Sequence, residues 1–367
     1  MKQRLFALIA TLGVASTAIA ADEIVGGPVV VNVTPRTATI LWLVNESGST
    51  LTEAASNQKF SAQSVGVRKT VYTGLKAGTA YNYALPGGLT GRFKTAPAPT
   101  STEPYTFIVY GDTRTRHDVH EKVMAEVVKT DADFILHTGD QVASGDDTSL
   151  WPVFFRIEKS VLAKTAFYPS LGNHERHASQ YFQYFDQRTP YYSFNWGNAH
   201  IAVVDSDTTT AALGTEAQSR YWKDQVAWLE QDLERNKTAT FKFVACHHPP
   251  FTAVSNRQGD NMHIMSLVPM LEKYGVTAMF NGHDHNYQHF EKNGIPYVTT
   301  GGGGAPLYDV DLPPAYITKK VEKTENFVRV RIEGNRATVE AIGTDGRVID
   351  QFVMTGGAGS AAKKAAR

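Results

Sequence analysis

The sequence predicts an α/β protein with a small all-β part first and a larger, layered α/β domain after it. From Ile24 to about Thr95, short runs rich in β-branched and aromatic residues alternate with Gly, Pro, Ser and Thr turns, a pattern typical of a small β-sandwich. After Tyr105, apolar strand-like runs alternate with helical patterns, as in strand–helix–strand units. The length of 367 residues also favours two domains over one.

The first twenty residues are predicted to be a signal peptide. Lys2 and Arg4 precede the apolar run Leu5–Ala10, and Ala18–Ala20 fits a small-residue cleavage site. This run is too short to span a bilayer, and no later segment is long and apolar enough, so we expect no stable membrane insertion. We therefore expect an exported protein, periplasmic or secreted, whose mature chain starts at Ala21.

Residues 21–97 are the predicted β-sandwich. The segment LKAGTAYNYAL within it resembles the turn-then-tyrosine segment of fibronectin type III modules. Residues 98–104 are rich in Pro, Thr and Ser and form a predicted linker. The α/β domain is expected to span 105–355, with meandering strands at its end, and 356–367 is predicted to be a disordered tail because it has no apolar pattern.

Charge and cysteine content exclude several classes of protein. The formal net charge is 0, and Lys2 and Arg4 are the only charged residues of the leader, so the mature chain would carry −2. Nothing in this balance favours electrostatic binding of nucleic acid. Cys246 is the only cysteine, which excludes an intrachain disulfide, and its apolar neighbours predict a buried thiol and not a nucleophile.

Polar residues follow five of the predicted strands of the α/β domain. Parallel strands carry their ligands beyond their carboxyl ends, so these residues are expected at one edge of the sheet. They are Gly111-Asp112 after YTFIVY, Gly139-Asp140 after DFILHT, Gly172-Asn173-His174-Glu175 after AFYPSL, His247-His248 after FKFVAC, and Gly282-His283-Asp284-His285 after VTAMF.

Each of these motifs taken singly has a structural interpretation, as an Asx turn, a helix cap or a polar loop. The two histidines of GHDH, however, share one side if they lie at the end of a strand, because side chains alternate there. Five carboxylate, amide or imidazole groups at one sheet edge favour a metal site over five independent turns.

The motifs GD, GD, GNHE, HHPP and GHDH, in this order, resemble the calcineurin-like metallophosphoesterase superfamily. Within that superfamily, the sequence resembles purple-acid-phosphatase-like proteins with an N-terminal fibronectin type III-like domain. The resemblance covers about Ile24 to Met354. It implies a β-sandwich flanked by α-helices, with two metal ions about 3.5 Å apart.

By this resemblance, each predicted ligand takes a role from its motif. Carboxylate, imidazole and amide ligands suit Mn, Fe or Zn, and the sequence does not choose among these ions. His247 is preferred over His248 from the spacing of VACH, and the choice stays open. The implied ligands are Asp140 bridging both ions, Asp112 and His285 on the first, and Asn173, His247 and His283 on the second.

The resemblance also implies the catalytic groups. His174 would protonate the leaving oxygen or stabilise charge on the phosphoryl group, with Glu175 orienting it, and a metal-bound hydroxide would be the nucleophile.

Two positions depart from the family pattern. Arg114 stands where many relatives have a histidine, and Ala143 stands where iron–tyrosinate enzymes have a tyrosine, so the iron-loaded protein is expected to lack the tyrosinate absorption band. Arg114 either contacts the substrate phosphate as a catalytic residue or pairs with Asp146 or Asp147 as part of the scaffold.

The predicted function is an exported, dinuclear-metal phosphohydrolase of the acid-phosphatase type that cleaves small-molecule phosphate monoesters. One alternative is a phosphodiesterase or nucleotide hydrolase, because the same metal pair serves both ester types. Another, of a different class, is an adhesion or binding protein with a degenerate metal site. The sequence does not indicate the oligomeric state.

Overall fold

A computed structural model describes residues 23–45 and 65–357 of the chain. The predicted signal peptide and residues 358–367 of the predicted tail lie outside the described residues. No helix in the described part of the chain is long and apolar enough to cross a membrane.

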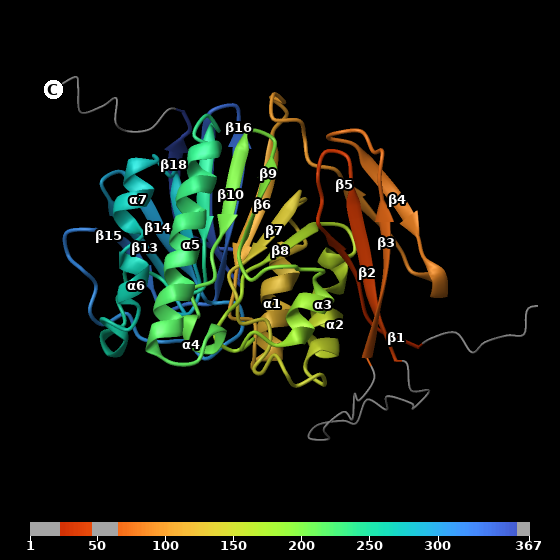
Figure 1. Ribbon diagram of the computed structural model, residues 1–367, viewed down its shortest axis with the longest axis horizontal. Coiled ribbons are helices and arrows are strands. Elements are labelled where there is room, and N and C mark those ends of the chain that lie inside the picture. Colours follow the sequence, from red (N-terminus) through yellow and green to blue (C-terminus); the bar gives the residue numbers. More distant parts are fainter. Residues whose placement is uncertain (1–22, 46–64, 358–367) are drawn as a thin grey trace, which may run out of the picture.

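Two large β-sheets pack face to face in the centre of the molecule (Figure 1). In spatial order, the nine-stranded sheet contains β18 (Val348–Thr355), β17 (Arg336–Gly343), β16 (Asn326–Glu333), β6 (Tyr105–Tyr110), β7 (Phe134–His137), β8 (Ala166–Pro169), β1 (Glu23–Val31), β2 (Ala38–Asn45) and β3 (Val65–Tyr72). The seven-stranded sheet contains β15 (Thr318–Glu322), β13 (Tyr287–Lys292), β14 (Ile295–Thr300), β12 (Ala278–Asn281), β11 (Phe241–Ala245), β10 (Ala199–Val203) and β9 (Tyr192–Trp196).

The central core lies between the inner faces of the two sheets. Phe107 of β6 stacks on Phe134 of β7 with ring centroids 4.7 Å apart, and meets Phe243 of β11 edge-on at 5.5 Å. The intervening residues Ile108 and Tyr110 of β6 point to the opposite face and are also fully buried. A strand buried on both faces must be apolar throughout, which is why YTFIVY is a continuous apolar run.

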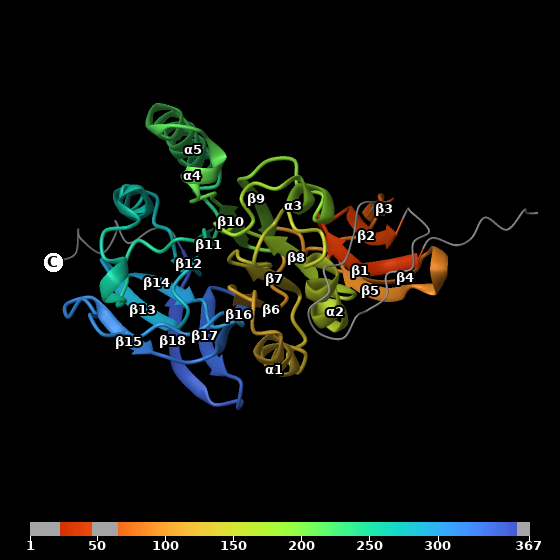
Figure 2. The ribbon, with the colours of Figure 1, turned by 90° about the horizontal axis from the view of Figure 1, so that it is seen from below.

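Helices cover the outer faces of both sheets (Figure 2). On the nine-stranded sheet lie α1 (His117–Val127), α2 (Trp151–Leu162) and α3 (Ser179–Tyr184). On the seven-stranded sheet lie α5 (Thr215–Arg235), α6 (Met262–Met265) and α7 (Val268–Lys273), with the short α4 (Thr208–Ala211) before α5. This four-layer arrangement confirms the predicted β-sandwich flanked by helices.

The described N-terminal part consists of short strands, as the sequence predicts, and three of them continue the nine-stranded sheet. β1 pairs in parallel with β8 through Val30 and Ala166. The hairpin of β4 (Ala80–Ala84) and β5 (Thr90–Lys94), joined by the 3₁₀ turn η1 (Pro86–Gly88), forms a second layer, in which Phe93 packs 5.9 Å from Tyr72 of β3. These two layers are consistent with a β-sandwich. The fibronectin-like character and the domain limits stay predictions.

The direction of the strands positions the functional site. β6, β7 and β8 run parallel in one sheet, and β10, β11, β12 and β14 run parallel in the other. The carboxyl ends of such strands meet at one edge, so the loops that follow them converge there.

Candidate metal centre

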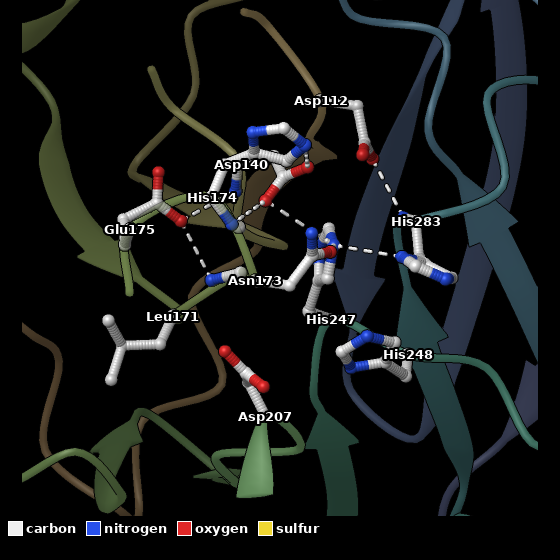
Figure 3. Close-up of polar contacts among 12 residues, drawn as sticks. Asp112, Asp140, Leu171, Asn173, His174, Glu175, Asp207, His247, His248 and His283 are labelled. Carbon is white, nitrogen blue, oxygen red and sulfur yellow. Dashed lines mark hydrogen bonds and ion pairs between the residues drawn. The ribbon is translucent and has the colours of Figure 1, made fainter. Parts of the chain in front are cut away.

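The predicted ligand residues lie together at the carboxyl-end edge of the two sheets, and all but His285 are labelled in Figure 3. Each comes from a loop that directly follows a strand, which fixes where its side chain begins. Asp112 follows β6, Asp140 follows β7, Asn173 and His174 follow β8, His247 follows β11, and His283 and His285 follow β12.

Three of these residues have strained backbones. Asp112, Asp140 and His283 adopt φ values of 59°, 58° and 69°, in the left-handed region that non-glycine residues rarely enter. Such conformations cost about 1–3 kcal/mol each and cluster at functional sites. A Cβ on Gly172 would come within 2.2 Å of Oδ1 of Asp140, so only glycine fits against this carboxylate.

His247 faces the centre of the ligand set. Its Nδ1 lies 2.8 Å from the carbonyl oxygen of Thr138, which can only accept, so Nδ1 carries a hydrogen, and in the neutral ring the lone pair is on Nε2. That Nε2 is 3.1 Å from Oδ1 of Asn173 and 3.5 Å from Oδ1 of Asp140. This tautomer is the one that a metal ligand needs.

His248 lies beside this set in a different environment. Its Nδ1 is 2.8 Å from Oγ of Ser206, and its ring centroid is 4.2 Å from that of His283. His248 can join His247 and His283 around one ion, but only His247 also forms a cluster with Asp112 and Asp140. The geometry therefore favours His247, as the spacing of VACH does.

Asp112 and the GHDH histidines form the other half of the site. The backbone N–H of His283 donates to Oδ2 of Asp112 at 2.9 Å, and Nε2 of His285 lies 3.5 Å from Oδ1 of Asp112. Nδ1 of His285 is 2.7 Å from the carbonyl oxygen of Pro306, so Nδ1 carries a hydrogen here too, and the neutral ring has its lone pair on Nε2. Burial, together with the nearby histidines and Arg257, holds the pKa of His283 well below its usual range, so its imidazole is neutral.

These residues fit a metal cation. Oδ1 of Asp112 is buried and has no hydrogen-bond partner among the described residues, an arrangement that is costly unless a cation satisfies it. The lone pair of Nε2 in His285 faces a guanidinium nitrogen of Arg114 at 3.4 Å, and that of His283 faces Arg257. The site thus directs carboxylate oxygens and imidazole lone pairs at cationic groups.

Arg114 contacts the predicted bridging carboxylate. Its Nε donates to Oδ2 of Asp140 at 3.1 Å. Asp146 and Asp147 instead accept hydrogen bonds from Ser144 and Ser149, so the alternative that Arg114 pairs with one of them is wrong. Burial alone would raise the pKa of Asp140, but His247, His174 and Arg114 outweigh it and hold that pKa below its usual value.

His174 presents one nitrogen to the site. Its Nδ1 lies 2.8 Å from the carbonyl oxygen of Ala143, and its Nε2 lies 3.9 Å from Oδ2 of Asp140. The side chain is 27% exposed, so Nε2 can reach a bound substrate. The main-chain carbonyl of Ala143 thus orients His174. The sequence resemblance had implied this role for Glu175.

Glu175 has a different role from the predicted one. It is fully buried, and its carboxyl group accepts from the backbone N–H groups of Asp140 at 2.9 Å, Gly172 at 2.7 Å and Val142 at 3.3 Å. Burial, and next the charge of Asp140, raise the pKa of Glu175 well above its usual value. Glu175 therefore joins the loops after β7 and β8 and holds the strained backbone of Asp140.

Arg257 and Tyr308 also lie at this site, and the sequence patterns did not indicate them. Arg257 ends the 3₁₀ turn η2 (Ser255–Arg257) and contacts Nε2 of His283, and it donates from Nη2 to the Tyr308 hydroxyl at 3.0 Å. The Tyr308 ring stacks on His285 with centroids 4.2 Å apart. Arg257 lies ten residues beyond His247 and Tyr308 eight residues beyond the end of β14, so neither belongs to one of the five strand-end motifs.

Fold and site together define a metal-dependent phosphoesterase. Residues 105–287 match the family model of calcineurin-like phosphoesterases, and this segment of the chain belongs to that family. The resemblance drawn from the GD, GNHE and GHDH motifs is thereby confirmed.

Known proteins with similar sequences are purple and tartrate-resistant acid phosphatases. The chain is 26% identical over 260 residues to probable purple acid phosphatase 20 of Arabidopsis thaliana, covering 63% of this chain and 58% of that protein. It is also 26% identical over 258 residues to tartrate-resistant acid phosphatase type 5 of Sus scrofa, covering 60% of this chain and 75% of that protein.

Solved structures share the fold over more of the chain. The purple acid phosphatase PPD1 from yellow lupin seeds superposes with a TM-score of 0.72 at 16% identity, covering 89% of this chain and 74% of that one. The structure of PhoD superposes with a TM-score of 0.65 at 13% identity, covering 94% of both chains. At these identities the likeness concerns the fold alone.

Proposed function

We propose that this protein is an exported phosphohydrolase that cleaves phosphate monoesters at a centre of two metal ions. The observation that carries the proposal is the convergence of Asp112, Asp140 and three imidazole rings at one sheet edge, with a buried oxygen of Asp112 that has no hydrogen-bond partner in the described part of the chain. The similarity to acid phosphatases of two organisms supports the monoester class. Export rests on the leader sequence.

The ligand roles proposed for this centre follow the geometry of the two halves. Asp140 lies between His247 on one side and Arg114 on the other, which suits a carboxylate shared by two ions. When bound, the ions polarise the phosphoryl oxygens and lower the pKa of an attacking water, and Mn, Fe and Zn all suit such ligands. The proposed ligands are Asp112, Asp140 and His285 for one ion, and Asp140, Asn173, His247 and His283 for the other.

His174 and Arg114 act on the substrate itself. Nδ1 of His174 donates to a main-chain carbonyl, so in the protonated ring the Nε2 N–H is the group that delivers a proton to the leaving oxygen. Arg114 reaches the same face from the loop after β6, and its guanidinium binds an anionic phosphoryl oxygen through charge-assisted hydrogen bonds. The two residues thus assist the leaving group and the phosphoryl group respectively.

Hydrolysis of p-nitrophenyl phosphate by the mature chain, with Mn²⁺ titrated in, tests the proposal. Asp140→Asn keeps the shape of the bridging side chain but removes its charge, and we expect it to lower kcat/KM by about 10²–10³-fold and to weaken metal binding. Asp224→Asn, on the exposed face of α5, is the matched control. Metal-independent turnover, or full activity of Asp140→Asn, would contradict the proposal.

A further inference from the structure

Arg257 places a second guanidinium group at the proposed metal centre. Its Nη1 contacts Nε2 of His283, its Nη2 donates to the Tyr308 hydroxyl at 3.0 Å, and its Cζ lies 4.8 Å from the centre of the Tyr308 ring. Arg114 approaches Asp140 and His285 from another loop. Two arginine side chains therefore reach the ligand set from different parts of the chain.

The loop that carries Arg257 is fixed in place. The backbone N–H and the hydroxyl of Ser255 both donate to the carboxylate of Asp311, at 3.0 and 2.7 Å. Leu312 N–H donates to the carbonyl oxygen of Ala253 at 2.8 Å, so three hydrogen bonds join the segment before Arg257 to the segment after Tyr308. A side chain presented from a braced loop loses little entropy when it binds a ligand.

The positive charge of Arg257 is only loosely balanced by its neighbours. The nearest carboxylate is Asp284, whose Oδ1 lies 3.7 Å from Nε. Oδ2 of Asp284 accepts instead from Thr252 and Gln288, and Oδ1 has no hydrogen-bond partner among the described residues. The other acceptors of Arg257, His283 and Tyr308, are uncharged groups. The Arg257 side chain is 22% exposed, and its charge is only weakly paired with Asp284. Its guanidinium therefore has the capacity to bind an anion.

The contact with His283 shows where that anion would bind. A metal ion and a guanidinium N–H cannot share the single lone pair of Nε2 in His283. With an ion on Nε2, Arg257 would keep Tyr308 and Asp284 as partners, and Nη1 would be the donor left for the substrate.

We propose that Arg257, positioned by Tyr308, is a specificity-determining residue that selects phosphate monoesters over diesters. This inference deepens the proposed function and rests on it. A monoester carries about two negative charges at neutral pH and three terminal oxygens. A diester carries one charge and has one terminal oxygen fewer, because a second ester bond replaces it. Arg257 supplies the donors for the oxygen that only a monoester offers.

The selectivity is measured as the ratio of kcat/KM for p-nitrophenyl phosphate to that for ethyl p-nitrophenyl phosphate, which have the same leaving group. We expect Arg257→Ala to lower the monoester value by about 10- to 100-fold and the diester value by less than about threefold. Arg257→Lys keeps the charge without the planar fork and should restore part of the ratio. Arg220→Ala, on the exposed surface of α5, is the control and should leave both values unchanged.

A readout apart from catalysis separates substrate recognition from metal binding. In the Mn²⁺-loaded protein, Arg257→Ala should weaken the binding of inorganic phosphate about tenfold by calorimetry, while the bound manganese per chain stays at the wild-type value. An equal loss on both esters, an unchanged ratio, or a loss of manganese that parallels the loss of rate would overturn the inference. If the wild type hydrolysed neither ester, the proposed function would fail, and the phosphate affinity would still decide whether Arg257 binds the anion.

Discussion

His174 is the residue whose geometry gives the most direct chemical expectation. Because Ala143 holds Nδ1, only Nε2 is available to protonate the leaving oxygen. Proton donation matters most when the leaving group is a poor one. We expect His174→Asn to lower kcat by about 10²–10⁴-fold for an alkyl phosphate, but by less than about tenfold for p-nitrophenyl phosphate. Steady-state kinetics with both substrates measure the difference.

The control for this comparison is His117→Asn, at the exposed start of α1, which should leave kcat unchanged for both substrates. Equal losses on the two esters would show that His174 acts on the phosphoryl group and not on the leaving oxygen. Metal content should match the wild type, because His174 is not among the proposed ligands.

At the residue scale, the sequence could indicate which residues gather at the strand ends but not all that surrounds them. Asp112, Asp140 and His283 each follow a strand and a glycine, and this local pattern can be recognised in the sequence. Arg257 and Tyr308 reach the site only because their loops are tied together through Asp311, a contact between segments far apart in the chain. No pattern within either loop encodes it.

At the scale of elements, polar side chains of β18 and β13 form hydrogen bonds that join the two sheets. Asp350 of β18 accepts from the Tyr287 hydroxyl at 2.9 Å and lies 2.8 Å from Nδ1 of His289, both on β13. Burial by itself raises the pKa of Asp350, but the hydrogen bonds from His289 and Tyr287 outweigh it, and the pKa is held below the usual value of 3.8. The ionised carboxylate therefore stabilises the contact between the sheets.

The sign of this effect gives a pH dependence. A carboxyl group with a lowered pKa in the folded protein adds stability above its unfolded pKa, and the stability is lost as the pH falls through the folded value. At pH values below about 4, we expect the urea midpoint of the wild type to decrease more than that of Asp350→Asn. At pH 7, the variant should be less stable than the wild type. Asp224→Asn is the control, and equal acid sensitivity of Asp350→Asn and the wild type would contradict this account.

At the scale of the whole molecule, the N-terminal strands and the catalytic layers share one sheet and one core. Runs of β-branched and aromatic residues predicted that this part of the chain forms short strands. The pairing of β1 with β8 could not be predicted, because a parallel contact between residues 30 and 166 leaves no local pattern. Tyr83 donates to the carbonyl oxygen of Ala163 at 2.7 Å, and Tyr168 donates to that of Val33 at 2.8 Å. Both hydrogen bonds join the N-terminal part to the rest.

Such sharing of core and hydrogen bonds predicts one cooperative unfolding transition for the whole chain and not two. Tyr168→Phe removes the donor to Val33 and should lower the stability of that single transition by about 0.5–1.5 kcal/mol. Circular dichroism and tryptophan fluorescence in urea should report the same midpoint, because Trp42 lies in the N-terminal part and Trp151 in the catalytic part. Both measurements are made in the presence of a chelator, so that metal release adds no separate step to the unfolding curve.

Tyr316→Phe, at a side chain that is 88% exposed, is the matched control and should leave the midpoint unchanged. Two resolved transitions, with Tyr168→Phe shifting only the earlier one, would mean that the N-terminal strands unfold as a separate module. A single transition that moves as a whole in Tyr168→Phe would mean that β1 supports β8. Since Asn173 and His174 follow β8 directly, the N-terminal strands would then also support the loop that carries them.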